Sequence, residues 1–436
     1  MGTRLLRIRE ASDWPDTFQP GDVAVVGAGS LGTRTLRQSI LGGSDPVTIV
    51  GEAFFNQAVA DDNIRPSDLK THARARSALR DKALRADHQA RVGALMVAPL
   101  TPIRVEQLQF SSGHWFFAGF DILAITRERH QFELGHHLAL RSTRAVLAHN
   151  RFSNRTADGD WLWNARNADG SPRNGGVLVR TFSTATDSMI ANTVFEDLRG
   201  YLCVSVGPGT RGVRVIGNTF RSVPRWQNNA GEAVHVGFSP RVSAPHQEPI
   251  YQALGARVER NLFERFDGDP EVIGVKVAHN IIRHNHIIDC AGALSLRGGA
   301  DNLVEHNVLV RSGGLRILGE RQTVRHNVVV LPSDGYGLWL EGGAQRAAWH
   351  PHREGNFLWH YRAAADCVVH DNRIIVPHQH LARAVSVRPA QGRLGFAADG
   401  SPISARAPTP SLLAQVRADN HVVQAAPIQD GAPAGP

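Results

Sequence analysis

The sequence predicts an all-β protein, a right-handed parallel β-helix, and two repeated patterns carry this prediction. From residue 145 onward an asparagine followed by apolar residues recurs, at Asn150, Asn192, Asn218, Asn261, Asn285, Asn307, Asn327, Asn372 and Asn420. The intervals from Asn261 to Asn327 are 24, 22 and 20 residues. Such a period, built of β-branched runs that alternate every two residues, is typical of a solenoid with three short strands per rung. Stacked asparagines at one corner are expected to form a hydrogen-bonded ladder.

The second pattern sets the register of one sheet in this solenoid. Aliphatic residues flank one variable position in AVHVG, GVKVA, ALSLR, GLRIL and GLWLE. If the aliphatic residues point inward, the variable positions point outward at equivalent places on successive rungs. These positions are His235, Lys276, Ser295, Arg316 and Trp339.

Residues 1–100 are expected to form an N-terminal cap and the first rungs, with a helical insertion. QPGDVAVV and DPVTIVG fit strands of the first rungs, and Pro66–Val92 has no glycine or internal proline and predicts helices. Gly27, Gly29 and Gly32, with Glu52 after a second strand-like run, also outline a dinucleotide-binding turn. A single motif of this kind is weak evidence, so the first rungs are the preferred interpretation.

Residues 101–424 are expected to form the β-helix itself. Ser239–Arg257 and Gly342–Asp366 lengthen two rungs and are interpreted as inserted loops. Residues 425–436 are rich in alanine, proline and glycine, which predicts a disordered tail.

Composition limits the partners of the chain. The 436 residues carry a net charge of +8, which favours an anionic partner such as an acidic polysaccharide. A nucleic acid is not expected, because no basic motif is interleaved with aromatic residues. The three cysteines lie far apart in apolar contexts and predict neither disulfides nor a metal site. No membrane span and no secretion signal are recognised, which by itself suggests a cytoplasmic protein; the oligomeric state is left open.

Lys276 stands out because only three of the 48 basic residues are lysines. It lies between two valines, where an ordinary surface cation has no obvious purpose. A lysine, unlike an arginine, can give up its proton near neutral pH and then act as a base. Lys276 is therefore the first candidate catalytic residue.

Several stretches resemble the chondroitinase B and alginate lyase family of parallel β-helix polysaccharide lyases, also called polysaccharide lyase family 6. They are SGHWFFAGFDI, NNAGEAVHVG, RNLFERFDGDPEVIGVKVAHN, ALSLRGG and GGLRILGE. The resemblance implies a lyase that cleaves a uronate-containing polysaccharide, alginate-like or dermatan/chondroitin-like, by calcium-assisted β-elimination. It also implies a periplasmic or secreted protein.

The resemblance assigns roles to individual residues. Lys276 corresponds to the base that removes the sugar C5 proton, and Arg297 to the arginine that assists it. Arg316 resembles a substrate-binding arginine, and the calcium ligands correspond to Asn229, Asp269 and Glu271. By rung alignment, the further substrate-binding candidates are Glu232, His235 and Trp339.

The chain departs from the family pattern at three positions. Gly298 replaces a histidine, Val277 replaces a small polar residue, and Asp269 is one methylene shorter than the usual glutamate. Two alternatives therefore stay open: an epimerase or biosynthetic enzyme that uses the same proton abstraction, or a non-catalytic module that binds an anionic glycan. The polymer and the endo or exo mode of cleavage are not predicted.

Overall fold

The computed structural model describes residues 3–37, 45–62, 64–84, 100–124, 136–163, 166, 168–171, 175–226, 231–237, 241–242, 252–332, 335–342, 344–348, 357–361, 363–388 and 408–425. The chain is divided into two compact units. Unit 1 consists of Met1–Phe238 and Ala253–Ile273, and unit 2 of Ser239–Gln252 and Gly274–Pro436. The division falls inside strand β21 (Glu271–Val275), and each unit is described by itself.

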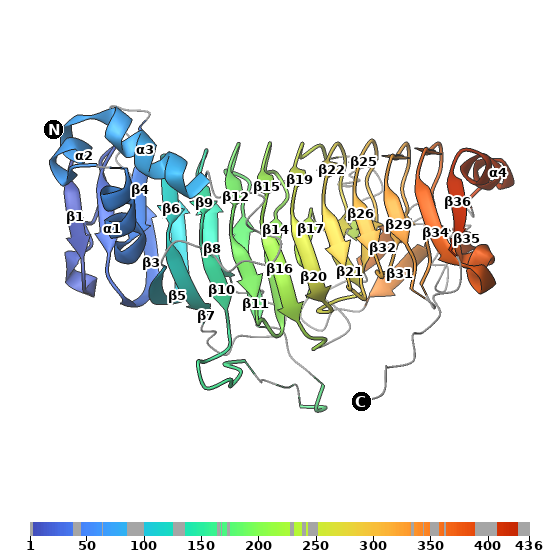
Figure 1. Cartoon of the computed structure of the whole chain (residues 1–436), viewed down its shortest axis with the longest axis horizontal. Helices are drawn as coiled ribbons and strands as arrows, with labels where there is room; N and C mark the ends of the chain where they lie inside the picture. Colours follow the sequence, from blue (N-terminus) through green and yellow to red (C-terminus); the bar gives the residue numbers. More distant parts are fainter. Residues whose placement is uncertain are drawn as a thin grey trace, which may run out of the picture. The chain divides into compact units, whose positions relative to one another are not determined.

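Unit 1 is a parallel β-helix in which three ladders of strands run side by side along the chain (Figure 1). Ladder A contains β1 (Leu5–Ile8), β2 (Val23–Val26), β4 (Val47–Gly51), β6 (Trp115–Ala118), β9 (Val146–Ala148), β12 (Met189–Ala191), β15 (Arg214–Ile216) and β19 (Arg257–Glu259). Ladder B contains β3 (Gly29–Arg37), β5 (Thr101–Ser111), β7 (Phe120–Ala124), β10 (Arg151–Ser153), β13 (Val194–Glu196), β16 (Thr219–Val223) and β20 (Leu262–Phe266). Ladder C continues from the far end of β5 and contains β8 (His136–Arg141), β11 (Gly176–Thr181), β14 (Tyr201–Val206) and β17 (Val234–Val236).

A column of stacked phenylalanines fills the interior beneath ladder B. Phe152, Phe195, Phe220 and Phe263 are all fully buried, and successive ring centroids lie 5.0, 4.8 and 4.8 Å apart. Their rings are nearly parallel because equivalent positions on successive rungs repeat at the spacing of hydrogen-bonded strands, ~4.8 Å. The stack places the neighbours of each phenylalanine, at alternate positions, on the outer face of the ladder.

The N-terminal glycines belong to rungs, so the dinucleotide-binding interpretation is wrong. Such a site needs a helix directly after the glycine turn, but here Gly29 begins β3, which pairs in parallel with β5. Glu52 begins helix α1 (Glu52–Asp61) instead of ending a strand.

The predicted helical insertion is present as α2 (Pro66–Thr71) and α3 (Ala73–Leu84). These helices bury Leu69 and Leu79 in one cluster with Phe54 and Phe55 of α1, beside the first rungs (Figure 1). A short 3-10 turn, Ala11–Asp13, precedes β2. Residues 85–92 of the predicted helical stretch lie outside the described residues.

Unit 2 repeats the parallel three-strand rung. One ladder contains β22 (Ile281–Arg283), β25 (Leu303–Glu305), β28 (Thr323–Arg325) and β33 (Val368–His370). A second contains β23 (His286–Ile288), β26 (Val308–Val310), β29 (Val328–Val330), β34 (Arg373–Pro377) and β36 (His421–Ala425). A third contains β24 (Ala293–Leu296), β27 (Leu315–Ile317), β30 (Leu338–Glu341) and β35 (Val385–Arg388).

The C-terminal part of unit 2 also contains a 3-10 helix, His378–Arg383, and helix α4 (Pro410–Ala418). The predicted parallel β-helix is thus confirmed. Residues 426–436 of the predicted tail lie outside the described part of the chain.

The asparagine ladder is present, with one correction. In unit 2, the backbone and side-chain amides of one asparagine both donate to the side-chain oxygen of the next. The asparagines linked in this way are Asn285, Asn307, Asn327, Asn372 and Asn420. In unit 1, Asn218 and Asn261 are joined in the same way. Asn192 is not in the ladder, because Thr193 takes that place and its backbone amide donates to the side-chain oxygen of Asn218. Asn192 instead donates to the carbonyl oxygens of Ala83 and Leu84 at the end of α3.

The two inserted segments meet in unit 2. β18 (Arg241–Val242), from the first insertion, pairs antiparallel with β32 (Phe357–Tyr361), which in turn pairs antiparallel with β31 (Ala344–Ala348). The sequence predicted both as loops, since neither has the repeat pattern. Among the residues described, no helix has the length and apolarity that a membrane-spanning helix requires.

Candidate active site

Three carboxylates gather at the corner of unit 1 that follows β20. Asp269 accepts hydrogen bonds from the backbone amides of Glu271, at 3.0 Å, and Gly231, at 3.3 Å. Glu232, Asp269 and Glu271 are 2%, 5% and 3% exposed. Gly231 and Gly268 must both be glycine here, since a Cβ on either would lie within 2.6 Å of the other's carbonyl oxygen. The tight backbone crossing therefore holds Asp269 and Glu232 at one corner.

The carboxylates at this corner repel one another. Burial, then the charge of Glu232, and to a smaller extent that of Glu271, raise the pKa of Asp269 to about 7, against the two backbone hydrogen bonds that favour its ionised form. His235, on β17, lies on the same side, with its Nδ1 4.0 Å from Glu232 Oε1. Buried negative charge of this kind is stabilised by a cation.

The donor set consists of carboxylate oxygens, which are ligands that calcium prefers. Asp269, Glu271 and Glu232 supply these oxygens. Within the described residues, however, no three His, Cys, Asp or Glu side chains converge closely enough to hold a metal ion. The predicted amide ligand, Asn229, lies outside the described residues.

Lys276 and Arg297 lie level with each other on successive rungs of unit 2. The amide of Arg297 donates to the carbonyl of Val275 at 2.8 Å, which is the parallel-strand bond for a register that pairs Arg297 with Lys276. The sequence alignment had placed Ser295 opposite Lys276, two residues away from this register. The alignment failed because Lys276 follows β21 and is not its central residue. Lys276 is 5% exposed, and Arg297 is half-buried.

The remaining predicted positions of unit 2 have the expected register. Ser295 pairs with Arg316, and Arg316 with Trp339. Arg316 is held by Glu341, whose Oε2 accepts a 2.6 Å hydrogen bond from its Nε. Trp339 is half-buried and meets Tyr336 edge-on at 5.0 Å.

Sequence reasoning missed one of these neighbours, Glu341. Glu341 is only 4% exposed and fixes the direction of the Arg316 guanidinium. Its place at the end of GLWLE, two residues after the outward Trp339, was the available signal. The contact between Glu232 and Asp269 was suggested by rung alignment, but the charge that it adds to Asp269 depends on the backbone crossing at Gly231 and Gly268.

Comparison with known proteins agrees with this architecture. Residues 212–333 match the family model described as Chondroitinase B, a range that includes Glu232, Asp269, Glu271, Lys276 and Arg297. No curated protein is similar to the chain in sequence.

Solved structures share the fold at low sequence identity. The alginate lyase AlyF-OU02, in complex with G6, is 14% identical, with a TM-score of 0.54 over 93% of this chain and 91% of its own. A family 6 alginate lyase in complex with a trisaccharide is 14% identical, with a TM-score of 0.53 over 97% and 90%. The family 6 polysaccharide lyase Pedsa3628 from Pseudopedobacter saltans is 13% identical, with a TM-score of 0.50 over 96% and 91%. The resemblance of this chain to the chondroitinase B and alginate lyase family of parallel β-helix polysaccharide lyases is thereby confirmed.

Proposed function

We propose that this protein is a polysaccharide lyase that cleaves a uronate-containing polysaccharide by β-elimination. The observation that carries the proposal is the pairing of Lys276 with Arg297 on successive rungs, inside the range that matches the family model. The similar solved structures include alginate lyases in complex with oligosaccharides, which makes alginate-like polymers the first substrates to test.

Lys276 is assigned as the base. In its neutral form it takes the proton from sugar carbon C5, and the electrons of that C–H bond form the C4–C5 double bond as the C4–O4 bond breaks. The leaving O4 takes up a proton and the product is a 4,5-unsaturated uronate. Arg297 stays protonated, so it can hold the developing negative charge and donate toward the leaving oxygen.

Asp269 and Glu271, with Asn229, are assigned as calcium ligands. A bound calcium ion would neutralise the substrate carboxylate and so make the C5 proton more acidic. Glu232, His235, Arg316 and Trp339 are assigned to substrate binding. Glu341 orients Arg316 for that purpose, because an ion-paired guanidinium keeps donors for a second carboxylate.

The proposal is tested with Lys276→Ala on the full chain. Ultraviolet absorbance of the unsaturated uronate is followed on alginate, dermatan sulfate and chondroitin sulfate, with calcium and with a chelator. Activity should fall by roughly 100- to 10,000-fold in Lys276→Ala, since the base is lost. Lys82→Ala removes a half-buried lysine that pairs with Asp61 and has no assigned role, and it should leave the rate unchanged.

Two results would contradict the proposal. A wild-type protein that forms no unsaturated product on any uronate polymer is not a lyase of this kind. Product without a double bond but with inverted C5 configuration, seen by NMR, would indicate an epimerase. Activity that persists after exhaustive chelation would remove calcium from the mechanism while leaving Lys276 in place.

A further inference from the structure

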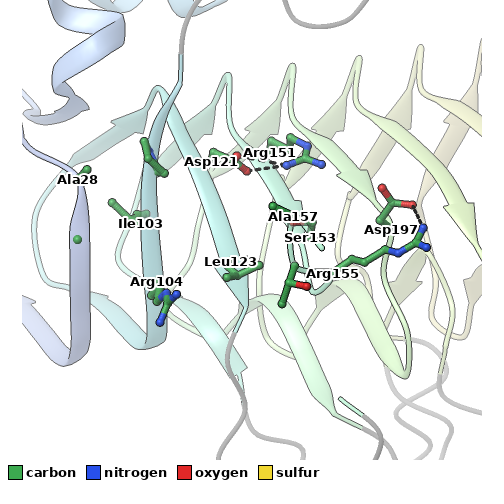
Figure 2. A pocket seen from close by; sticks show the side chains of 13 residues that line it. Ala28, Ile103, Arg104, Asp121, Leu123, Arg151, Ser153, Arg155, Ala157 and Asp197 are labelled. Atoms are coloured by element: carbon green, nitrogen blue, oxygen red, sulfur yellow. Dashed lines mark hydrogen bonds and ion pairs between the residues drawn. The ribbon is translucent and has the colours of Figure 1, made fainter. Parts of the chain in front are cut away.

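A cavity of about 680 Å³ lies on the outer face of ladder B, and none of the residues assigned above lines it. It is walled by β3, β5, β7 and β10 and by the segment that follows β10 (Figure 2). Its volume is within the usual range of small-molecule sites.

Small outward side chains create the hollow. Ile122 and Phe152 point into the core and are fully buried. Their strand neighbours Leu123 and Ser153 line the cavity, together with Pro102 and with Gly29, which has no side chain and pairs with Ile103. Farther along the same ladder, Glu196 and Arg221 are ion-paired and cover this face.

Three arginines and two aspartates give the cavity its charged groups. Arg151 is neutralised, because it donates to Asp121 at 3.0 Å and to Glu196 at 2.5 Å. Arg104 is exposed and forms no ion pair with any residue that the structure describes. Arg104 therefore brings a positive charge to the cavity that its surroundings do not cancel.

Arg155 is positioned at the opposite edge. Its Nε donates to the carbonyl of Gly159 at 2.9 Å, and its guanidinium lies 5.3 Å from the ring centroid of Trp161. Its ion pair with Asp197 is long, at 4.0 Å, and the side chain is 45% exposed. Backbone and ring thus fix the direction of Arg155 while donors remain for a ligand carboxylate.

We propose that this cavity is a distal subsite that binds an acidic sugar residue, with Arg104 and Arg155 recognising its carboxylate; the inference rests on the proposed function and extends it. Ser153, Thr156 and the two aspartates can bond sugar hydroxyls, and Leu123 can pack against an apolar sugar face.

A line of arginine and tryptophan side chains leads from the cavity toward the carboxylate corner of the same unit. Trp161 also lies 5.6 Å from the guanidinium of Arg199, which stacks on Trp226 at 3.8 Å. Burial, and to a smaller extent the nearby charge of Arg166, lower the pKa of Arg199. From β10 the ladder passes β13 and β16 to β20, which precedes Asp269; three rung spacings make this about 14 Å. A short oligosaccharide can span that distance.

The test measures binding by the full-length Lys276→Ala protein, in which cleavage does not interfere. A saturated hexauronate from alginate and a neutral glucose hexasaccharide of equal length are titrated calorimetrically. Adding Arg104→Gln and Arg155→Gln together should weaken hexauronate binding by about tenfold or more, since charged hydrogen bonds are lost. Arg214→Gln, an exposed arginine on β15 in ladder A, is the matched control and should change nothing.

Other results of these titrations would overturn either the subsite or the lyase proposal. Equal hexauronate affinity with and without the two substitutions overturns the subsite, as does equal affinity for the neutral hexasaccharide. If the wild-type protein yields no unsaturated product but the two substitutions still weaken hexauronate binding, the lyase proposal fails and the acidic-sugar site stands.

Discussion

Two adjacent glycines follow Arg297, and the backbone constrains them differently. Gly299 has φ +77°, and a Cβ there would lie 2.2 Å from the carbonyl oxygen of Val277. At Gly298 the nearest atom to a Cβ is the carbonyl oxygen of Lys276, at 3.3 Å. The histidine that the family pattern has at position 298 would thus approach the Lys276 backbone closely but without overlap.

Gly299→Ala should therefore destabilise unit 2 by about 1 to 3 kcal/mol, because it combines strain at positive φ with a steric clash. Gly298→Ala should cost less than ~1 kcal/mol. Denaturant unfolding of both variants measures the difference. Equal losses for the two alanines would show that the backbone relaxes around position 299.

A second residue-scale prediction concerns Glu196. Burial alone would raise the pKa of this carboxyl, but hydrogen bonds from Arg151 and Arg221 outweigh it and hold the pKa below the ordinary value of 4.5. A depressed folded-state pKa contributes stability at neutral pH that is lost as the pH falls through the folded value. Glu196→Gln should lower the melting temperature at pH 7, with a gap to wild type that narrows below pH ~4. Glu264→Gln, on the same face of ladder B, is the control. A difference in melting temperature between Glu196→Gln and wild type that does not depend on pH would refute the role of the Glu196 pKa.

At the scale of the element, the asparagine ladder joins one rung to the next. Asn307 is fully buried, bonds Asn327 through its backbone and side-chain amides, and accepts from both amides of Asn285. The backbone amides of Asn285 and Asn307 thereby find acceptors at a corner where no strand pairs them.

Removing one member leaves its neighbours' donors buried without acceptors. Asn307→Ala should therefore destabilise unit 2 by roughly 1 to 3 kcal/mol. His306→Ala changes the exposed residue beside it and should have a much smaller effect. Denaturation midpoints of the two variants measure their stabilities. Similar losses of stability in both would mean that the asparagine ladder contributes little.

Packing between helices and strands also explains why two positions were aligned wrongly from the sequence. Thr193 takes the place of an asparagine in the ladder, and Asn192 instead caps the end of α3. Either residue could stand at the corner of the rung, and the helix packed there decides which one does. Likewise, Arg297 and not Ser295 lies level with Lys276, since the strand before the lysine ends at Val275.

At the scale of the whole molecule, the net charge of +8 attracts an anionic polymer at long range. Raising the ionic strength from about 0.1 M to about 1 M shortens the Debye length from ~10 to ~3 Å. Affinity of Lys276→Ala for hexauronate should fall over this range, as measured by calorimetry. Affinity that does not change with salt would mean that short-range contacts alone hold the ligand.

The sequence by itself determined the repeat, the three-strand rung, the family resemblance and the candidate base, because these depend on local periodicity and on a rare residue type. The tertiary structure decided what depends on neighbours from other rungs. It placed Glu232 beside Asp269, paired Arg297 with Lys276, tied Arg316 to Glu341 and hollowed the outer face of ladder B. A one-residue shift in register changes which side chains meet across rungs, and that shift is set by packing, which no single repeat encodes.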